Sequence, residues 1–201
     1  MRIQIIVIIM LSLLNQLSLA KLSDKTPNNA EQLVQKARLQ VTKTIYYDPA
    51  YIRLDYPNGD VPLDRGVCTD VIIRALRDAF KYDLQEKIHE DMRQNFSKYP
   101  KIWKAKKTDR NIDHRRVPNI ETFLTRLGKN IAVTKNAEDY HAGDIVSVRL
   151  NNITPHIFII SDKRSQDGIR PLIIHNIGAG TQEEDQLFKH PITGHFRFLG
   201  Q

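Results

Sequence analysis

The sequence predicts an α+β protein in which helices come first and an antiparallel sheet follows. Apolar residues recur at helical spacing in several segments of the first 128 residues. After Gly143 the pattern changes to short runs of β-branched residues separated by turn-forming residues. The helical and extended segments do not alternate, which argues against βαβ units and for antiparallel strands.

The composition is that of one soluble globular domain. The chain has 201 residues with 30 basic and 23 acidic side chains, and hydrophobic residues make up 41% of it. This composition excludes collagen-like, disulfide-rich and disordered proteins. A chain of this length forms one hydrophobic core, and the sequence contains no internal repeat.

The first 20 residues have the pattern of a secretory signal peptide. Arg2 precedes an apolar stretch over residues 3–14, and small residues mark a cleavage site after Ala20. The alternative is a membrane anchor, but three polar residues interrupt the run before it reaches the roughly 18 to 20 apolar residues that a span requires (Gln4, Asn15 and Gln16). We therefore expect an exported protein, periplasmic or extracellular, whose single domain covers residues 21–201, with no membrane span after cleavage.

Four helices are predicted before the strands. Each has apolar residues at intervals of three or four, and polar residues or a glycine mark its ends. The helices are predicted to begin at Asn28 or Asn29, at Cys68, after Asp83 and near Asn119; the second covers residues 68–80 and the last ends at Gly128. In the last helix, four residues are expected to face the core (Ile120, Phe123, Leu124 and Leu127).

Cys68 is the single cysteine of the chain, so the protein has no internal disulfide. It opens the helix predicted over residues 68–80, and the helical period turns it inward. At a helix N-terminus the dipole and the unpaired amides stabilise a thiolate, which is the form of cysteine that attacks carbonyl carbons. Packing as a small apolar residue and pairing with another chain remain open.

Four strands are predicted in the second half of the chain. Their sequences are DIVSVRL, HIFIISD, PLIIHNI and GHFRFL, at residues 144–150, 156–162, 171–177 and 194–199. The run HIFII is apolar at both odd and even positions after its histidine. It is therefore expected to be a central strand that is covered on both faces.

Two of the seven histidines interrupt strands that are otherwise apolar, His156 and His175. Burying an imidazole without a hydrogen-bond partner is costly, so we expect the two rings to share a polar site with Cys68, where one takes the thiol proton. The alternative is that backbone groups satisfy each ring separately. His89, His141 and His190 are expected at the surface, and His114 is expected to contact substrate.

Zinc is a competing use of Cys68, His156 and His175. No paired ligand spacing such as CxxC or HExxH accompanies these residues. We therefore expect neither a metal nor an organic cofactor.

Residues 93–116, here called the basic segment, contain nine basic and two acidic residues. Phe96, Tyr99 and Trp103 are interleaved with these charges, which in a cytoplasmic protein indicates single-stranded nucleic acid. Export argues against that partner. A solvated surface and attraction to an anionic envelope polymer are the two remaining interpretations.

The order of the motifs resembles that of the NlpC-type cell-wall peptidases, a papain-like group. The strings GVCTDVIIRAL, AGDIVSV, PHIFIISD and PLIIHN carry the resemblance. In that group a cysteine opens a helix, a Gly-Asp pair starts a strand, a histidine on the next strand is the base, and a third polar residue orients it. The resemblance implies these roles for Cys68, for Gly143 with Asp144, for His156 and for His175.

A closer resemblance, to the YijF-like family of exported bacterial proteins, covers nearly all of residues 21–201. This family is classed as a domain of unknown function, and the strings YPNGDVP, GVCTDV, NIDHRRVPN, PHIFIISD and HNIGAG carry the resemblance. It implies a papain-like fold of the NlpC type, with N-terminal helices packed on a C-terminal antiparallel sheet. Tyr56, in the loop before Cys68, is the candidate for the tyrosine that NlpC-type enzymes often place near the oxyanion.

We therefore expect an exported cysteine amidohydrolase or peptidase that acts as a monomer. Cys68 attacks an amide carbonyl, His156 moves the proton, and His175 orients His156. Resemblance and export point to cell-wall peptidoglycan as the substrate. Two alternatives remain: an acyltransferase that uses the same thioester, and a non-catalytic module that binds an anionic envelope polymer through the basic segment.

Overall fold

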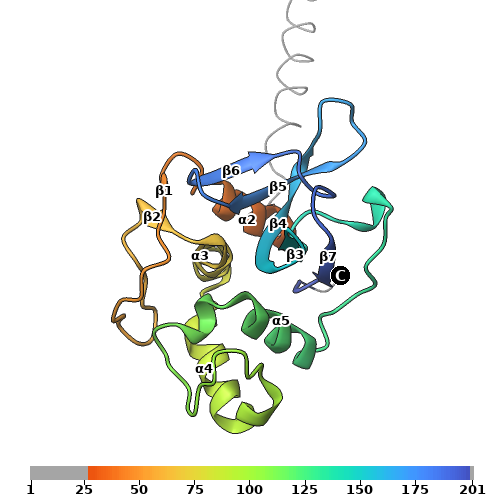
Figure 1. Ribbon diagram of the computed structural model, residues 1–201. Helices are drawn as coiled ribbons and strands as arrows, with labels where there is room; N and C mark the ends of the chain where they lie inside the picture. The colour runs from red at the N-terminus through yellow and green to blue at the C-terminus, as the bar shows by residue number, and fades with distance from the viewer. Residues whose placement is uncertain (1–26, 200–201) are drawn as a thin grey trace, which may run out of the picture.

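The computed structural model describes residues 27–199, and the predicted signal peptide lies outside them. The described part is an α+β domain with four α-helices and an antiparallel sheet of five strands. The helices are α2 (Asn29–Arg38), α3 (Cys68–Phe80), α4 (Leu84–Asn95) and α5 (Val117–Arg126). Figure 1 shows α3 between the sheet and α4. The predicted fold class is thus confirmed at the level of α+β.

The sheet has the strand order β6-β5-β4-β3-β7. In chain order its strands are β3 (Ile145–Leu150), β4 (Thr154–Arg164), β5 (Pro171–Asn176), β6 (Thr181–Glu184) and β7 (Ile192–Phe196). A separate parallel pair joins β1 (Tyr46–Tyr47) to β2 (Arg65–Gly66) just before α3. The sequence did not predict β6, whose residues TQEE are polar and carry no strand pattern.

Strand β4 lies at the centre of the sheet and is covered on both faces, as predicted. Ile157 and Ile159 pack into the helix-side core, which also contains Cys68. Phe158 and Ile160 belong to a second core on the opposite face. The alternation of side chains along a strand therefore separates neighbouring residues of β4 into two different environments.

The helix ends follow local capping chemistry. The Asn28 side chain accepts a hydrogen bond from the Glu31 amide, and the Glu31 carboxylate accepts one from the Asn28 amide. Helix α5 starts at Val117, two residues before the predicted start, since Pro118 is well suited to a first helical turn. The prediction that Leu127 faces the core is wrong, because Leu127 follows the last helical residue and is exposed.

Among residues 27–199, no helix is both long enough and apolar enough to cross a membrane.

Candidate active site

Cys68 is the first residue of α3 and is buried. The helix starts here because the Asp70 carboxylate accepts a hydrogen bond from the Val67 amide at 2.7 Å, which closes the first turn. No hydrogen bond from the Cys68 amide to a residue of the described region is present. That amide is therefore an available donor beside the sulfur.

The Cys68 thiol is protonated at neutral pH. Burial raises its pKa to about 12, and the N–H groups of Ile157, Thr69 and Cys68 itself, which face the sulfur, act in the opposite direction. Burial thus outweighs the stabilisation that a helix N-terminus gives to a thiolate. Attack by this sulfur would therefore require a base to take the thiol proton.

A cavity of about 210 Å³ opens beside the sulfur. Its walls come from β1 and the loop after it, the start of α3, the loop after α4, the start of α5 and the start of β4. The lining residues are Tyr47, Pro49, Val67, Cys68, Trp103, Ile112, Arg115, Val117, Pro118 and Pro155. Most of these side chains are apolar or aromatic, as is typical of ligand pockets. We call it the Cys68 pocket.

Arg115 and Asp70 form a buried ion pair next to this pocket. The guanidinium donates from Nε and Nη2 to the two Asp70 oxygens at 3.0 and 2.9 Å. Its remaining donors reach the carbonyls of Ala50 and Asp48. Arg115 therefore ties the loop after β1 to the start of α3, and its positive charge is neutralised internally.

His156 on β4 and His175 on β5 lie on the same face of the sheet and are joined directly. The distance from His156 Nε2 to His175 Nδ1 is 2.8 Å, and His175 Nε2 lies 2.8 Å from Glu184 Oε1 on β6. Both rings are buried. The predicted association of these two histidines is thus present, and the structure adds a third member, Glu184.

The hydrogen-bond chain fixes the tautomer of both rings. A carboxylate only accepts hydrogen bonds, so His175 donates from Nε2 to Glu184 and accepts at Nδ1 from His156 Nε2. His156 then carries its proton on Nε2, and its Nδ1 keeps a free lone pair. Burial lowers the pKa of His156 to about 3 and also lowers that of His175, which Glu184 partly counteracts. Both rings are therefore neutral.

The predicted catalytic contact between Cys68 and His156 stays a prediction. Within the described residues no hydrogen bond joins the sulfur to the ring, although the sulfur faces the amide of the next residue, Ile157. Ile157 packs in the same core as Cys68, whereas His156 is paired with Val148, and its ring centroid lies 6.4 Å from that of Phe158.

The zinc alternative concerns buried Cys68 and the two linked rings. Over residues 27–199, no group of three His, Cys, Asp or Glu side chains is placed to hold one metal ion.

Tyr56 does not line the Cys68 pocket. Its ring packs edge-on against His89 at 5.3 Å, and the Arg110 guanidinium lies 5.5 Å from its centroid. The tyrosine in the pocket is Tyr47, whose pKa is raised by burial and then by the charge that Cys68 carries when ionised. The role predicted for Tyr56 stays a prediction, and Tyr47 is the tyrosine that a strand of two residues brings to the pocket.

Gly143 and Asp144 precede β3 as the motif implies, and their role is structural. Gly143 has a φ of +84°, which a residue with a side chain adopts only with strain. Asp144 is buried and accepts hydrogen bonds from His195 Nε2 at 2.8 Å and from Arg197. This network ties β3 to β7, and the sequence did not single out His195.

The remaining histidines are placed differently from one another. His114, predicted to contact substrate, is buried, and burial lowers its pKa to about 3. Its Nδ1 has no hydrogen-bond partner in the described part of the chain. His141 is exposed as predicted, while His89 and His190 are half-buried. His114 is thus a residue of the interior, because the turn over residues 113–115 packs inward.

Comparison with known proteins identifies the family. The family model called domain of unknown function (DUF1287) matches residues 34–198. A protein of Escherichia coli (strain K12) called uncharacterized protein YijF is 57% identical over 163 residues, which are 81% of this chain and 78% of the E. coli protein. The chain therefore belongs to the DUF1287 family.

Proposed function

We propose that this protein is an exported cysteine amidohydrolase or peptidase of the papain-like NlpC type that cleaves an amide bond in cell-wall peptidoglycan. The observation that carries the proposal is the chain Glu184–His175–His156, which leaves a lone pair on His156 Nδ1, one residue along β4 from the amide that faces the Cys68 sulfur. A base oriented by a second polar group is what a thiol nucleophile requires.

The reaction begins with proton transfer from the Cys68 thiol to His156 Nδ1 as sulfur attacks the amide carbon. The tetrahedral intermediate collapses when the imidazolium returns that proton to the leaving amine, which leaves a thioester on Cys68. Water, deprotonated by His156, then cleaves the thioester and yields a carboxylic acid and the free thiol. Atoms and charge balance with water as the only co-reactant.

In this proposal two groups stabilise the oxyanion. The Cys68 amide has no partner among the described residues, and amides at a helix start are suited to a developing negative charge. The Tyr47 side chain lines the same pocket. These contacts support attack from within the Cys68 pocket.

Catalysis requires the sulfur and the His156 ring to come into hydrogen-bond contact when substrate binds. Catalytic hydrogen bonds are often loose in free enzymes and tighten in the substrate complex. The amide of Ile157, the residue after His156, already faces the sulfur, so the start of β4 lies beside Cys68. The proposal therefore includes a local rearrangement at the start of β4.

Purified peptidoglycan incubated with the protein in H₂¹⁸O tests the proposal. We expect new fragments in which the released carboxylate carries one ¹⁸O, detected by mass spectrometry. Cys68→Ser and His156→Asn should each abolish these fragments, while His141→Asn, which changes an exposed histidine, should not. Fragments produced by Cys68→Ser, or none produced by the wild type, would contradict the proposal. Products without ¹⁸O that carry an added amine would instead support acyl transfer.

A second candidate function is non-catalytic binding of an anionic envelope polymer. It is favoured by the stacking of the Arg116 guanidinium on Trp103, 4.2 Å from the ring centroid, at the wall of the Cys68 pocket. This function predicts that wild type and Cys68→Ser sediment equally with insoluble peptidoglycan and that neither releases fragments.

A further inference from the structure

We infer that Trp103 and Arg116 form a subsite for an acidic sugar at the Cys68 pocket. The inference deepens the proposed function, because the sugar would belong to the polymer that carries the scissile amide. It depends on features outside the thiol and histidine groups, so it can be tested separately from catalysis.

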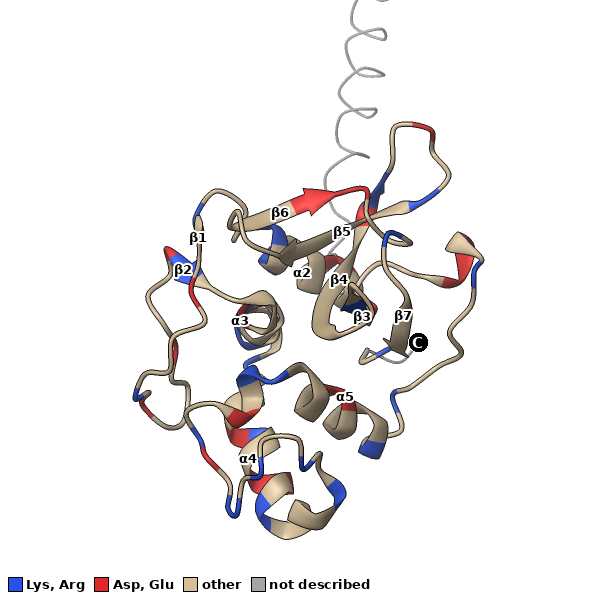
Figure 2. Ribbon diagram, in the orientation of Figure 1, with Lys and Arg blue, Asp and Glu red and all other residues tan. Residues whose placement is uncertain are grey.

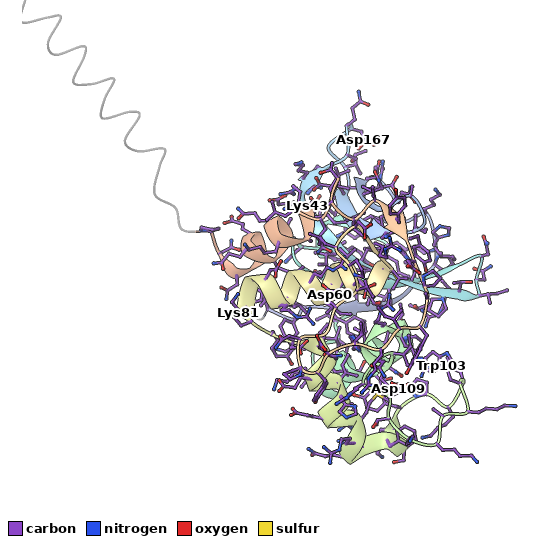
Figure 3. All side chains as sticks on the ribbon, turned by 90° about the vertical axis from the view of Figure 1, so that its left-hand side faces the viewer. Lys43, Asp60, Lys81, Trp103, Asp109 and Asp167 are labelled. Carbon is purple, nitrogen blue, oxygen red and sulfur yellow. The ribbon has the colours of Figure 1, made fainter. Side chains whose placement is uncertain are left out.

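Trp103 supplies an exposed aromatic face. It lines the Cys68 pocket, and 37% of its surface is accessible. Figure 3 shows it at the periphery of the molecule, on the loop between α4 and α5. An exposed indole is a flat surface suited to the C–H face of a pyranose ring, and pockets commonly combine such surfaces with few polar groups.

Arg116 supplies free donors next to that face. Its guanidinium stacks on the indole and makes one hydrogen bond, from Nη1 to Asp113 Oδ1 at 3.3 Å. Its Nε and Nη2 bond to no residue within 27–199. Arg115, its neighbour, differs because Asp70 and two carbonyls occupy its donors. Arg116 does not itself line the pocket, but it stacks on the pocket residue Trp103 and has donors available to pair with a ligand carboxylate.

The loop around the pocket carries more positive than negative charge. Four exposed lysines lie on it (Lys101, Lys104, Lys106 and Lys107). Figure 2 shows blue Lys and Arg segments along the loop beside α4. Its two acidic residues are engaged, Asp109 with Tyr51 and Asn111, and Asp113 with the Asp109 amide and Arg116. The field around the pocket therefore attracts anions.

A single ligand class satisfies both groups: a pyranose ring that lies on the indole and carries a carboxylate within reach of the guanidinium. A neutral sugar leaves Arg116 without a partner, and an inorganic anion leaves the indole uncovered. Charge complementarity and the aromatic face together point to an acidic saccharide.

Trp103 is the only tryptophan of the chain, so its fluorescence reports directly on this subsite. The experiment titrates the full protein with N-acetylmuramic acid and with N-acetylglucosamine, which share the ring and differ by a carboxylate-bearing lactyl group. We expect a saturable change in emission with the acidic sugar, at least tenfold weaker apparent affinity for the neutral sugar, and weakening of the acidic response by added salt.

Arg116→Gln should weaken the acidic response at least tenfold. The matched control is Arg110→Gln, because Arg110 lies over Tyr56, an aromatic residue that, unlike Trp103, does not line the pocket. Circular dichroism verifies that both variants are folded. Equal responses to the two sugars, no response to the acidic sugar, or an unchanged response in Arg116→Gln would overturn the inference. Cys68→Ser should keep the full response, so loss of activity and loss of this subsite are distinguishable.

Discussion

His156 Nε2 donates a hydrogen bond to His175 Nδ1 across adjacent strands, and this bond is the second step of a chain that ends at Glu184. Because Glu184 can only accept, the chain has one direction. Its consequence is that the basic nitrogen of His156 is Nδ1. In a papain-like mechanism this nitrogen would receive the thiol proton.

The first prediction concerns Glu184 as a positioning residue. Glu184→Gln keeps an acceptor for His175 Nε2. It removes the negative charge that favours an imidazolium at His156, the other end of the hydrogen-bond chain. We expect kcat for peptidoglycan fragments to fall about tenfold with KM unchanged, and the pH profile of kcat to shift. Glu183→Gln provides a comparison from the same strand, since Glu183 bonds instead to Arg38, Ser161 and Lys163. If both substitutions shift the pH profile equally, Glu184 does not act on His156 through His175.

The second prediction concerns the reactivity of Cys68. Because burial raises the pKa of the thiol to about 12, its alkylation by iodoacetamide should accelerate about tenfold per pH unit between pH 7 and pH 10, without a plateau. In denaturant the same thiol should level off near the ordinary value of about 8.5. Mass spectrometry of quenched samples gives both rates. A plateau below pH 8 in the folded protein would show a standing thiolate and contradict the burial argument.

The third prediction concerns acid stability. Burial lowers the pKa of His156 to about 3, whereas an unfolded chain binds the proton near pH 6.5. The unfolded state therefore holds more protons below pH 6.5, and stability falls as the pH decreases from there toward 3, by about 1.4 kcal/mol per pH unit for this one group.

Urea unfolding between pH 7 and pH 4.5 measures this dependence. His156→Asn should reduce the slope of unfolding free energy against pH, and His114→Asn should do the same, because His114 is also buried with a pKa of about 3. The exposed His141, changed to Asn, is the control. Parallel slopes in wild type and both buried-histidine variants would contradict neutral burial of these rings.

Much of the fold could be predicted because local patterns determine it. Helix α3 begins at Cys68 and ends at Phe80, as the apolar period predicts. In the structure, Lys81 ends the helix in the αL conformation. Strand β4 is central because HIFII is apolar at every position after its histidine. Strand β6 was missed because its polar residues form an edge strand whose pairing with β5 depends on tertiary contacts.

The candidate site was predicted only in part, for a geometric reason. Periodicity shows that His156 and Ile157 point in opposite directions, but it does not show which of them meets α3. In the structure, Ile157 is the residue that packs in one core with α3. Glu184 was missed together with β6, and Trp103 could not be assigned to the pocket because only the path of a long loop brings it there.

The last prediction separates the two tyrosines. Tyr47 lines the Cys68 pocket, whereas Tyr56 packs against His89 under Arg110. Tyr47→Phe removes one hydroxyl from a partly exposed side chain, so stability should change by less than about 0.5 kcal/mol. If the hydroxyl stabilises the oxyanion, kcat should fall by at least about tenfold. Tyr56→Phe should change kcat on the same peptidoglycan fragments by less than twofold. The reverse pattern would return the oxyanion role to Tyr56 and would require the loop before α3 to rearrange when substrate binds.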